Sequence, residues 1–232
     1  MMARDNARQV REQTSTEMWE QLNRLYLALR SMSLREMWRG ETIEFFHDVI
    51  NDLHLFHGIT DATMSHGEGW HFIQLGRYME RAQLIAALLG NHFGADAKNH
   101  TQPAETPHEW VNLLKMCSAF EAYCKVFTAD VQPGRITEFL VFDPEFPRSI
   151  RFAVDMVQAE LQTIAPESNI RRAGRADRIA GRLRASLDFG QIDEIMDGDI
   201  QARFKNIEDQ IAEIHDAMLE SYIAYPVDAH IS

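Results

Sequence analysis

The stretch of sequence that decides the fold runs from Trp70 to His92 and reads WHFIQLGRYMERAQLIAALLGNH. It contains no proline, and at about 100° per residue its apolar side chains spread over nearly the whole circumference of a helix. Such a helix is typical of the interior of a helical bundle. We therefore expect a long, buried central helix against which the other helices pack.

Helical patterns also dominate the rest of the chain, and its seven prolines fall outside the strongest periodic segments. The last helix has apolar residues at steps of three and four. This pattern predicts a long helix packed within the bundle, and the alternative is a coiled coil that forms a homo-oligomer. The fold class is all-α, a multi-helix bundle. The predicted helices span residues 3–32, 41–57, 66–92, 107–129, 134–141, 147–164, 169–189 and 199–224, and the predicted linkers are 33–40, 94–106, 131–134, 142–146 and 166–168.

The composition is that of an acidic globular protein. The chain has 232 residues, of which 45% are hydrophobic and 25% charged, enough for one large domain with a sizeable core. Its 23 basic and 35 acidic residues give a formal net charge of −12, which argues against nucleic-acid binding. The first twelve residues are polar, and no apolar run approaches the ~18 residues of a membrane span. We expect a cytoplasmic protein that does not enter the membrane.

The two cysteines, Cys117 and Cys124, fall seven residues apart in one predicted helix. On ideal geometry their Cα atoms lie about 10 Å apart along the helix axis. This separation is too large for a disulfide within the chain. We expect both to be small buried side chains.

Three charged residues interrupt the central helix, namely Arg77, Glu80 and Arg81. Charges on a buried helix are costly unless they are paired, so something must satisfy them. One interpretation is an internal salt-bridge network between helices, which includes a same-helix pair of Arg77 and Glu80. The other is a polar pocket in which arginines hold a carboxylate or a phosphate. In that pocket, Gly76 would allow a ligand or another backbone to approach closely.

Two short motifs raise the question of a metal site. Glu44-x-x-His47 and Glu68-x-x-His71 have the Glu-x-x-His spacing of di-iron helical bundles. Such sites also need glutamates from two further helices, and Glu68 and His71 fall at the edge of the predicted bundle. We expect no metal, and a carboxylate-histidine metal protein is a further alternative. Phosphate loops and zinc-type cysteine pairs are absent from the sequence, so we expect no cofactor.

Residues 69–82, GWHFIQLGRYMERA, resemble the signature of the alpha-E family, a helical domain named for a Glu-Arg motif. That motif corresponds here to Glu80 and Arg81. Further blocks of resemblance lie at residues 3–12, 18–23, 58–64 and 138–149, so the likeness extends over nearly the whole chain. The resemblance implies a bacterial, all-helical protein with a single domain over residues 1–232.

The resemblance also implies a functional setting. Alpha-E proteins are typically encoded beside, or fused to, a circularly permuted ATP-grasp protein, often with a transglutaminase-like protein nearby. This company implies an accessory or partner role in ATP-dependent formation of peptide or amide bonds. The alternative is a non-enzymatic helical scaffold or oligomerisation module, and whether the chain is itself an enzyme stays open. The candidate residues that would hold an anionic peptide or a phosphorylated intermediate are Arg77, Glu80, Arg81, Arg11, Glu12 and Arg148.

Family members usually carry an earlier copy of the Gly-Arg-x-x-Glu-Arg helix, ahead of the segment that begins here at Ala3. We expect this chain to lack that copy and to resemble the C-terminal portion of a family member. On this hypothesis, Arg4, Arg8 and Arg11 are without the partners that the earlier copy would supply.

Overall fold

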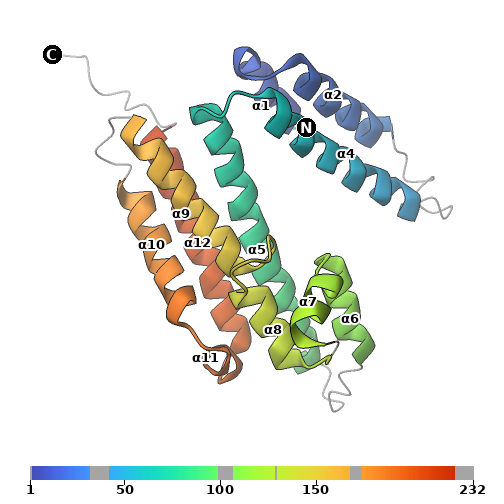
Figure 1. Ribbon diagram of the computed structural model, residues 1–232, viewed down its shortest axis with the longest axis vertical. Helices are drawn as coiled ribbons and strands as arrows, with labels where there is room; N and C mark the ends of the chain where they lie inside the picture. Colours follow the sequence, from blue (N-terminus) through green and yellow to red (C-terminus); the bar gives the residue numbers. More distant parts are fainter. Residues whose placement is uncertain (1, 32–41, 99–106, 129, 168–173, 223–232) are drawn as a thin grey trace. The chain divides into compact units, whose positions relative to one another are not determined.

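A computed structural model describes residues 2–31, 42–98, 107–128, 130–167 and 174–222, and these residues form helices joined by short connections (Figure 1). The predicted all-α fold is confirmed. The chain forms two compact units, unit 1 over residues 1–71 and unit 2 over residues 72–232. None of the described helices combines the length and the apolar content needed to cross a membrane.

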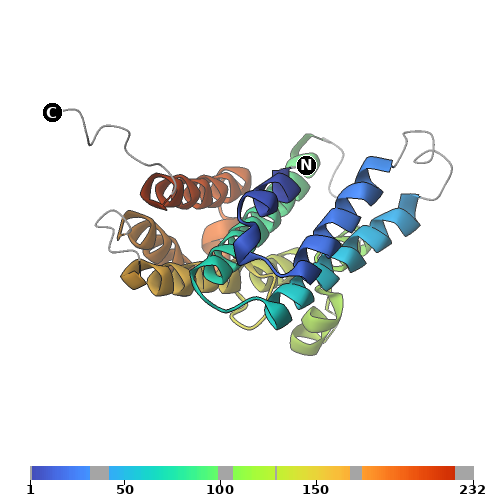
Figure 2. The same ribbon diagram turned by 90° about the horizontal axis from the view of Figure 1, so that it is seen from above.

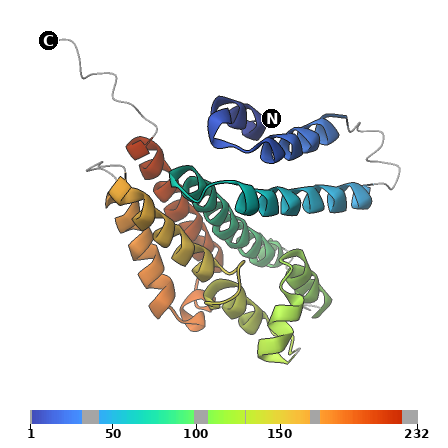
Figure 3. The ribbon, with the colours of Figure 1, turned by 45° about the horizontal axis from the view of Figure 1, so that its top comes forward.

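Unit 1 is built on two antiparallel helices, which Figure 3 shows side by side in blue and light blue. At one end of the pair, the Ser15 and Thr63 hydroxyls share a hydrogen bond of 2.7 Å. Further along, Asp52 accepts hydrogen bonds from the side chains of Gln21 and Arg24, with the Arg24 Nη2 to Asp52 Oδ1 distance at 2.7 Å. These polar contacts fix the alignment of the two helices. The elements of unit 1 are α1 (Met2–Gln9), a 3-10 turn (Arg11–Gln13), α2 (Thr16–Ser31) and α4 (Thr42–Thr63).

The predicted continuous helix over residues 3–32 is wrong, because the chain breaks between α1 and α2. Ser15 precedes α2, and its Oγ accepts a hydrogen bond of 3.1 Å from the backbone N–H of Met18. A serine in this position satisfies an amide that has no partner within the helix, so it favours a new helix start. Arg4, Arg8 and Arg11 therefore lie before the start of α2.

Unit 2 is a bundle in which α9, α10 and α12 lie lengthwise beside one another, as Figures 1 and 2 show. The helix α5 joins this bundle through ring contacts, with Phe72 against Tyr222 and Phe93 against Phe204. The described helices that contribute to unit 2 are α5 (Glu68–Lys98), α6 (Pro107–Met116), α7 (Phe120–Phe127), α8 (Pro133–Phe142), α9 (Ile150–Glu167), α10 (Gly174–Phe189), α11 (Ile192–Met196) and α12 (Ile200–Tyr222).

The core of unit 2 is formed by apolar stripes at steps of three and four. The stripe on α12 is buried inside the unit, which confirms the prediction of a long helix packed within the bundle. Burial on α5 is confined to one side, because Leu84 is 60% exposed. The buried residues of the two stripes are Leu75, Met79, Ala82, Ala86 and Leu89 on α5, and Phe204, Ile207, Ile211, Ile214 and Met218 on α12.

The helix α5 extends six residues beyond its predicted end at residue 92. Gly94 is buried inside it, and a Cβ atom there would lie 1.7 Å from Nε2 of Gln201 on α12. A Cβ atom on Gly90 would lie 3.3 Å from the Cβ of Phe204. Both glycines allow α12 to approach α5 closely, and the helix continues through Gly94, where the linker was predicted to begin.

The predicted helix over residues 107–129 is also wrong, since the chain turns between α6 and α7. Ser118 has a left-handed backbone with φ of 51°, and this turn lets Trp110 and Tyr123 enter the same core. Cys117 lies in the turn and is buried, whereas Cys124 lies on α7. Both cysteines are free, and the expectation that both are buried holds for Cys117 but not for Cys124, which is only partly buried.

The other boundaries follow the sequence with small differences. The helix α4 passes the predicted end at residue 57 and continues to Thr63, and the short α11 was not predicted. The helices α8 and α9 begin and end within three residues of the predicted positions. The predicted linker 33–40, residues 99–106 of the next linker and residues 168–173 lie outside the described residues.

Candidate functional site

Three half-buried arginines gather on one side of α5. Arg77 and Arg81 lie one turn apart on this helix, and their guanidinium carbons lie 5.9 and 5.4 Å from the ring centre of Tyr78. Nη1 of Arg81 donates a hydrogen bond of 3.4 Å to the carbonyl of Pro147 in the loop between α8 and α9. The next residue of that loop, Arg148, is close enough to repel the charge of Arg81. We call Arg77, Arg81 and Arg148 the arginine cluster.

The loop that carries Arg148 is held by its own hydrogen bonds. Asp143 follows α8, and its Oδ1 accepts hydrogen bonds from the backbone N–H groups of Glu145 and Phe146, at 2.9 and 2.7 Å. The hydroxyl of Ser149 donates a hydrogen bond of 2.5 Å to the carbonyl of Asp143. Short polar side chains that bond to nearby backbone fix turns of this kind. The loop therefore presents Arg148 to α5 from a defined backbone.

The arginine cluster forms no ion pair within 4.0 Å among the described residues. Other arginines of unit 2 do find carboxylates: Arg151 pairs with Asp188 at 2.9 Å. Within the cluster, Nε of Arg77 is buried and has no hydrogen-bond partner in the described part of the chain. A salt-bridge network around these three arginines is thus not present there.

Burial and repulsion both act on the charge of Arg81. Burial has the largest effect and lowers the pKa of its guanidinium, and the positive charges of Arg77 and Arg148 lower that pKa further. Tyr78 and Glu80 raise the pKa and offset part of this lowering. Arginine stays protonated in proteins. The lowered pKa therefore indicates that the positive charge of Arg81 is unfavourable at this position without an anion beside it. A bound anion would offset both effects.

Glu80 is exposed and lines a separate groove, although its negative charge still acts on Arg81. The predicted same-helix pair with Arg77 is not formed within 4.0 Å. The groove lies between α5 and α12 and has a volume of about 320 Å³. A Cβ atom on Gly76 would meet no atom within 4 Å, so this glycine leaves the groove open. The lining residues are Gly76, Met79, Glu80, Gln83, Ile211, Ala212 and His215.

The remaining two sequence candidates, Arg11 and Glu12, lie in the 3-10 turn of unit 1 and are exposed. The arginine cluster belongs to unit 2. The residues that the structure brings together are therefore Arg77, Arg81 and Arg148. Sequence analysis missed Tyr78, which lies against both arginines of α5, although its position directly after Arg77 on a helix was a signal.

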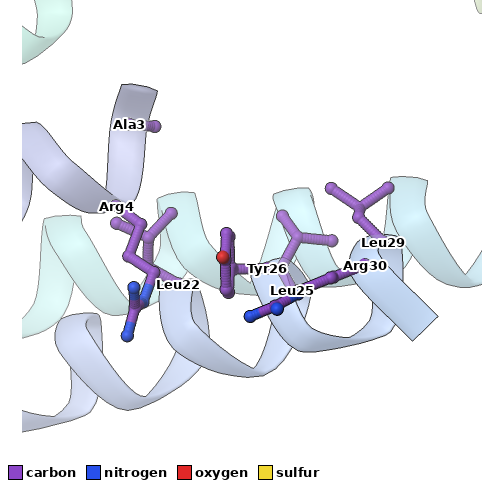
Figure 4. A pocket seen from close by; sticks show the side chains of 7 residues that line it. All are labelled: Ala3, Arg4, Leu22, Leu25, Tyr26, Leu29 and Arg30. Atoms are coloured by element: carbon purple, nitrogen blue, oxygen red, sulfur yellow. The ribbon is translucent and has the colours of Figure 1, made fainter. Parts of the chain in front are cut away.

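A groove in unit 1 was also missed by sequence analysis (Figure 4). It has a volume of about 200 Å³ and is largely apolar. Arg4 closes one end: its Nε donates a hydrogen bond of 2.8 Å to Asn23, and its guanidinium lies 4.5 Å from the ring centre of Tyr26. This arginine is thus held by its neighbours. The lining residues are Ala3, Arg4, Leu22, Leu25, Tyr26, Leu29 and Arg30.

Thiol and metal chemistry find little support in the described residues. Burial raises the pKa of Cys117 to about 11, and the nearby charge of Arg148 lowers it by a smaller amount. A thiol with this pKa is protonated at neutral pH and is a poor nucleophile. Among the described residues, no three His, Cys, Asp or Glu side chains are grouped as metal ligands would be. The arrangement is suited to binding an anion through guanidinium groups.

Comparisons with known proteins find relatives that are named as uncharacterized proteins. The chain is 24% identical to the uncharacterized protein Mb2597 of Mycobacterium bovis over 185 residues, which is 78% of this chain and 20% of that protein. It is 26% identical to the uncharacterized protein Rv2567 of Mycobacterium tuberculosis over 130 residues, which is 56% of this chain and 14% of that protein. The chain thus spans about a fifth or less of the length of these curated relatives. No solved structure gives a significant match.

The family model that matches is Alpha-E, described as a predicted alpha-helical domain with a conserved ER motif. It matches residues 1–223, which is essentially the whole chain and not only its C-terminal portion. The chain has a single Glu-Arg dipeptide, Glu80-Arg81. The absence of an earlier copy of this helix stays a prediction. The chain belongs to the Alpha-E family.

Proposed function

We propose that this chain is an accessory or partner protein of an ATP-grasp-type system that forms peptide or amide bonds. In this role the arginine cluster holds an anionic peptide or a phosphorylated intermediate. The observation that carries the proposal is that the three arginines of the cluster form no ion pair within 4.0 Å with a carboxylate among the described residues. The chain as a whole has a net charge of −12, so acidic residues were abundant enough to pair with these arginines. Binding of an anionic ligand would explain why these arginines have no carboxylate partner.

The geometry of Arg81 suits a planar anion. Its guanidinium uses one N–H on the carbonyl of Pro147 and lies against the ring of Tyr78. A guanidinium group has five N–H donors, so further donors are available for a carboxylate or a phosphate. The ring contact restricts the orientation of the guanidinium, which reduces the entropy that binding would cost.

The groove beside Glu80 suits the part of a peptide that carries no negative charge. A carboxylate accepts hydrogen bonds from backbone N–H groups but repels an anion. We therefore assign the acidic group of the ligand to the arginine cluster and its amide groups to the Glu80 groove. Arg11 and Glu12 stay predicted contributors, and Arg11→Ala tests them separately.

The direct test is titration calorimetry of the purified chain with a short acidic peptide and with pyrophosphate. We expect wild type to bind at least one of these ligands. Arg81→Ala should weaken that binding at least about ten-fold, which corresponds to about 1.4 kcal/mol. Arg182→Ala is the matched control, because Arg182 is an exposed arginine of unit 2 outside the cluster. Equal affinities of wild type and Arg81→Ala for the ligand would show that the arginine cluster is not the binding site.

The partnership needs an experiment of its own, because the chain spans only part of its relatives. We expect a tagged chain, recovered from its native cells, to co-purify with an ATP-grasp protein or a transglutaminase-like protein. Recovery of the chain without either protein would contradict the partnership and leave the calorimetry of the arginine cluster unaffected.

The second candidate function is a helical scaffold or oligomerisation module. The specific observation in its favour is the large amount of apolar side chain that α4 leaves exposed, in positions where a helix normally packs. A chain that binds neither ligand and forms a defined oligomer would match this function.

A further inference from the structure

A second apolar seam runs along α4 and is not covered by the other described residues of unit 1. It consists of Ile43, Phe46, Ile50 and Leu53, which follow one another at steps of three, four and three. Their exposed fractions are 72%, 51%, 47% and 42%. These steps are the a and d spacing of packed helices, which normally bury such residues. We call these four residues the α4 seam.

The α4 seam lies outside the contact between α4 and α2. That contact runs along the side of α4 that carries Asp52, which binds Gln21 and Arg24 of α2. Phe45, on the same side of α4 as Asp52, is partly buried, whereas its neighbour Phe46 is 51% exposed. At about 100° per residue, the two apolar sides point in different directions. The α4 seam is therefore free to take a further helix.

Unit 1 has little apolar core of its own. Among its described residues, Met18 and Leu25 are the buried apolar side chains, whereas nine large apolar side chains are exposed. The described part of unit 2 is more than twice as long and exposes only four. A pair of helices cannot enclose a core, whereas four helices can. A contiguous exposed patch of this kind marks an interaction surface.

We propose that two copies of this chain associate through the α4 seam, so that α2 and α4 of each copy form a four-helix bundle. Each copy has a net charge of −12, so two copies repel unless they meet on a face without acidic side chains. Over residues 43–53 the α4 seam is such a face. At about 100° per residue, Glu44, Asp48 and Asp52 lie on the opposite half of the helix.

The residues that border the α4 seam suit an interface between identical surfaces. His47 and His54 lie along its edge and are exposed. They are polar and are not acidic, so they form a polar rim that adds no negative charge to the edge of the α4 seam. A two-fold contact brings the same patch together from both copies, and an apolar seam whose edge carries no acidic residue is complementary to itself.

Sedimentation equilibrium of the full chain, from low to high micromolar concentration, tests the association. We expect a concentration-dependent shift from the 26.7 kDa chain to twice that mass. Ile50→Glu should keep the protein monomeric over the same range, because it places a charge in the α4 seam. The matched control is Leu55→Glu, since Leu55 is 46% exposed on the same helix but lies on its other side. This control should associate like wild type.

Two results would overturn the proposal. If the wild-type chain stays monomeric at every concentration, a second copy does not bind the α4 seam. If Ile50→Glu dimerises as strongly as wild type, the α4 seam is not part of the interface. Far-UV circular dichroism shows whether Ile50→Glu keeps its helices, and Phe46→Ser gives a milder change at the same surface. A folded Phe46→Ser variant that dimerises as strongly as wild type also contradicts the proposal.

Discussion

Cys117 illustrates how a single buried side chain links the fold to pH. Its pKa of about 11 lies above that of a thiol in the unfolded chain, because the folded protein disfavours the thiolate. The folded state therefore holds this proton more tightly. The resulting contribution to the free energy of unfolding is fully present below about pH 8.5 and is lost as the pH rises toward 11.

We expect the free energy of unfolding of wild type to fall more steeply between pH 9 and 11 than that of Cys117→Ala. Chemical denaturation under reducing conditions measures both slopes, and comparing slopes removes the general cost of the smaller side chain. Cys124→Ala should keep the wild-type slope. Parallel slopes for wild type and Cys117→Ala would show that this thiol does not titrate as described.

The residues of the candidate site could be predicted only in part. Arg77 and Arg81 stood out because charges on an apolar helix need an explanation, and the structure does bring them to Arg148. Their lack of carboxylate partners depends on where the loop after α8 lies relative to α5, which residue spacing does not encode. Glu80 was expected beside Arg77, but the rotation of α5 places it in the groove toward α12.

Helices were recognised from periodicity, whereas their ends depended on tertiary contacts. The predicted end at residue 92 was wrong, since α5 continues through Gly94, where α12 approaches it closely. Two serines mark breaks in helices that were predicted to be continuous. Ser15 caps the start of α2, and Ser118 has the left-handed backbone of the turn between α6 and α7. Apolar periodicity alone carries no information on either effect.

Two glycines of α5 give a matched pair of substitutions. In Gly76→Ala the added Cβ atom would meet no atom within 4 Å. This substitution should raise the free energy of unfolding by up to about 1 kcal/mol, because alanine has a higher helix propensity than glycine. Gly90→Ala should stabilise less or destabilise, because its Cβ would lie 3.3 Å from the Cβ of Phe204. Thermal denaturation measures the difference. A larger gain from Gly90→Ala than from Gly76→Ala would contradict the close approach of α5 and α12.

At the scale of the whole molecule, the two units should differ in stability. Unit 2 has an extensive apolar core, whereas Met18 and Leu25 are the buried apolar side chains of the described part of unit 1. We expect amide hydrogens of α2 and α4 to exchange with solvent at least about ten-fold faster than those of α9 and α10, since a gap of about 1.4 kcal/mol in opening free energy suffices.

Hydrogen exchange followed by mass spectrometry measures this difference at peptide resolution. In dilute protein the contrast should be largest, and protection of α4 should rise with protein concentration if two copies associate through it. Uniform protection across both units at low concentration would contradict the assignment of a small core to unit 1.

The central claim is that the arginine cluster binds a ligand and does not hold the helices together. The most direct measurement is the free energy of unfolding of Arg81→Ala relative to wild type, without ligand. We predict a change of at most about 1 kcal/mol, because Arg81 loses a cation–π contact with Tyr78 and one long hydrogen bond, while repulsion within the cluster is relieved. A loss of about 3–5 kcal/mol would show a buried ion pair instead and would contradict the account.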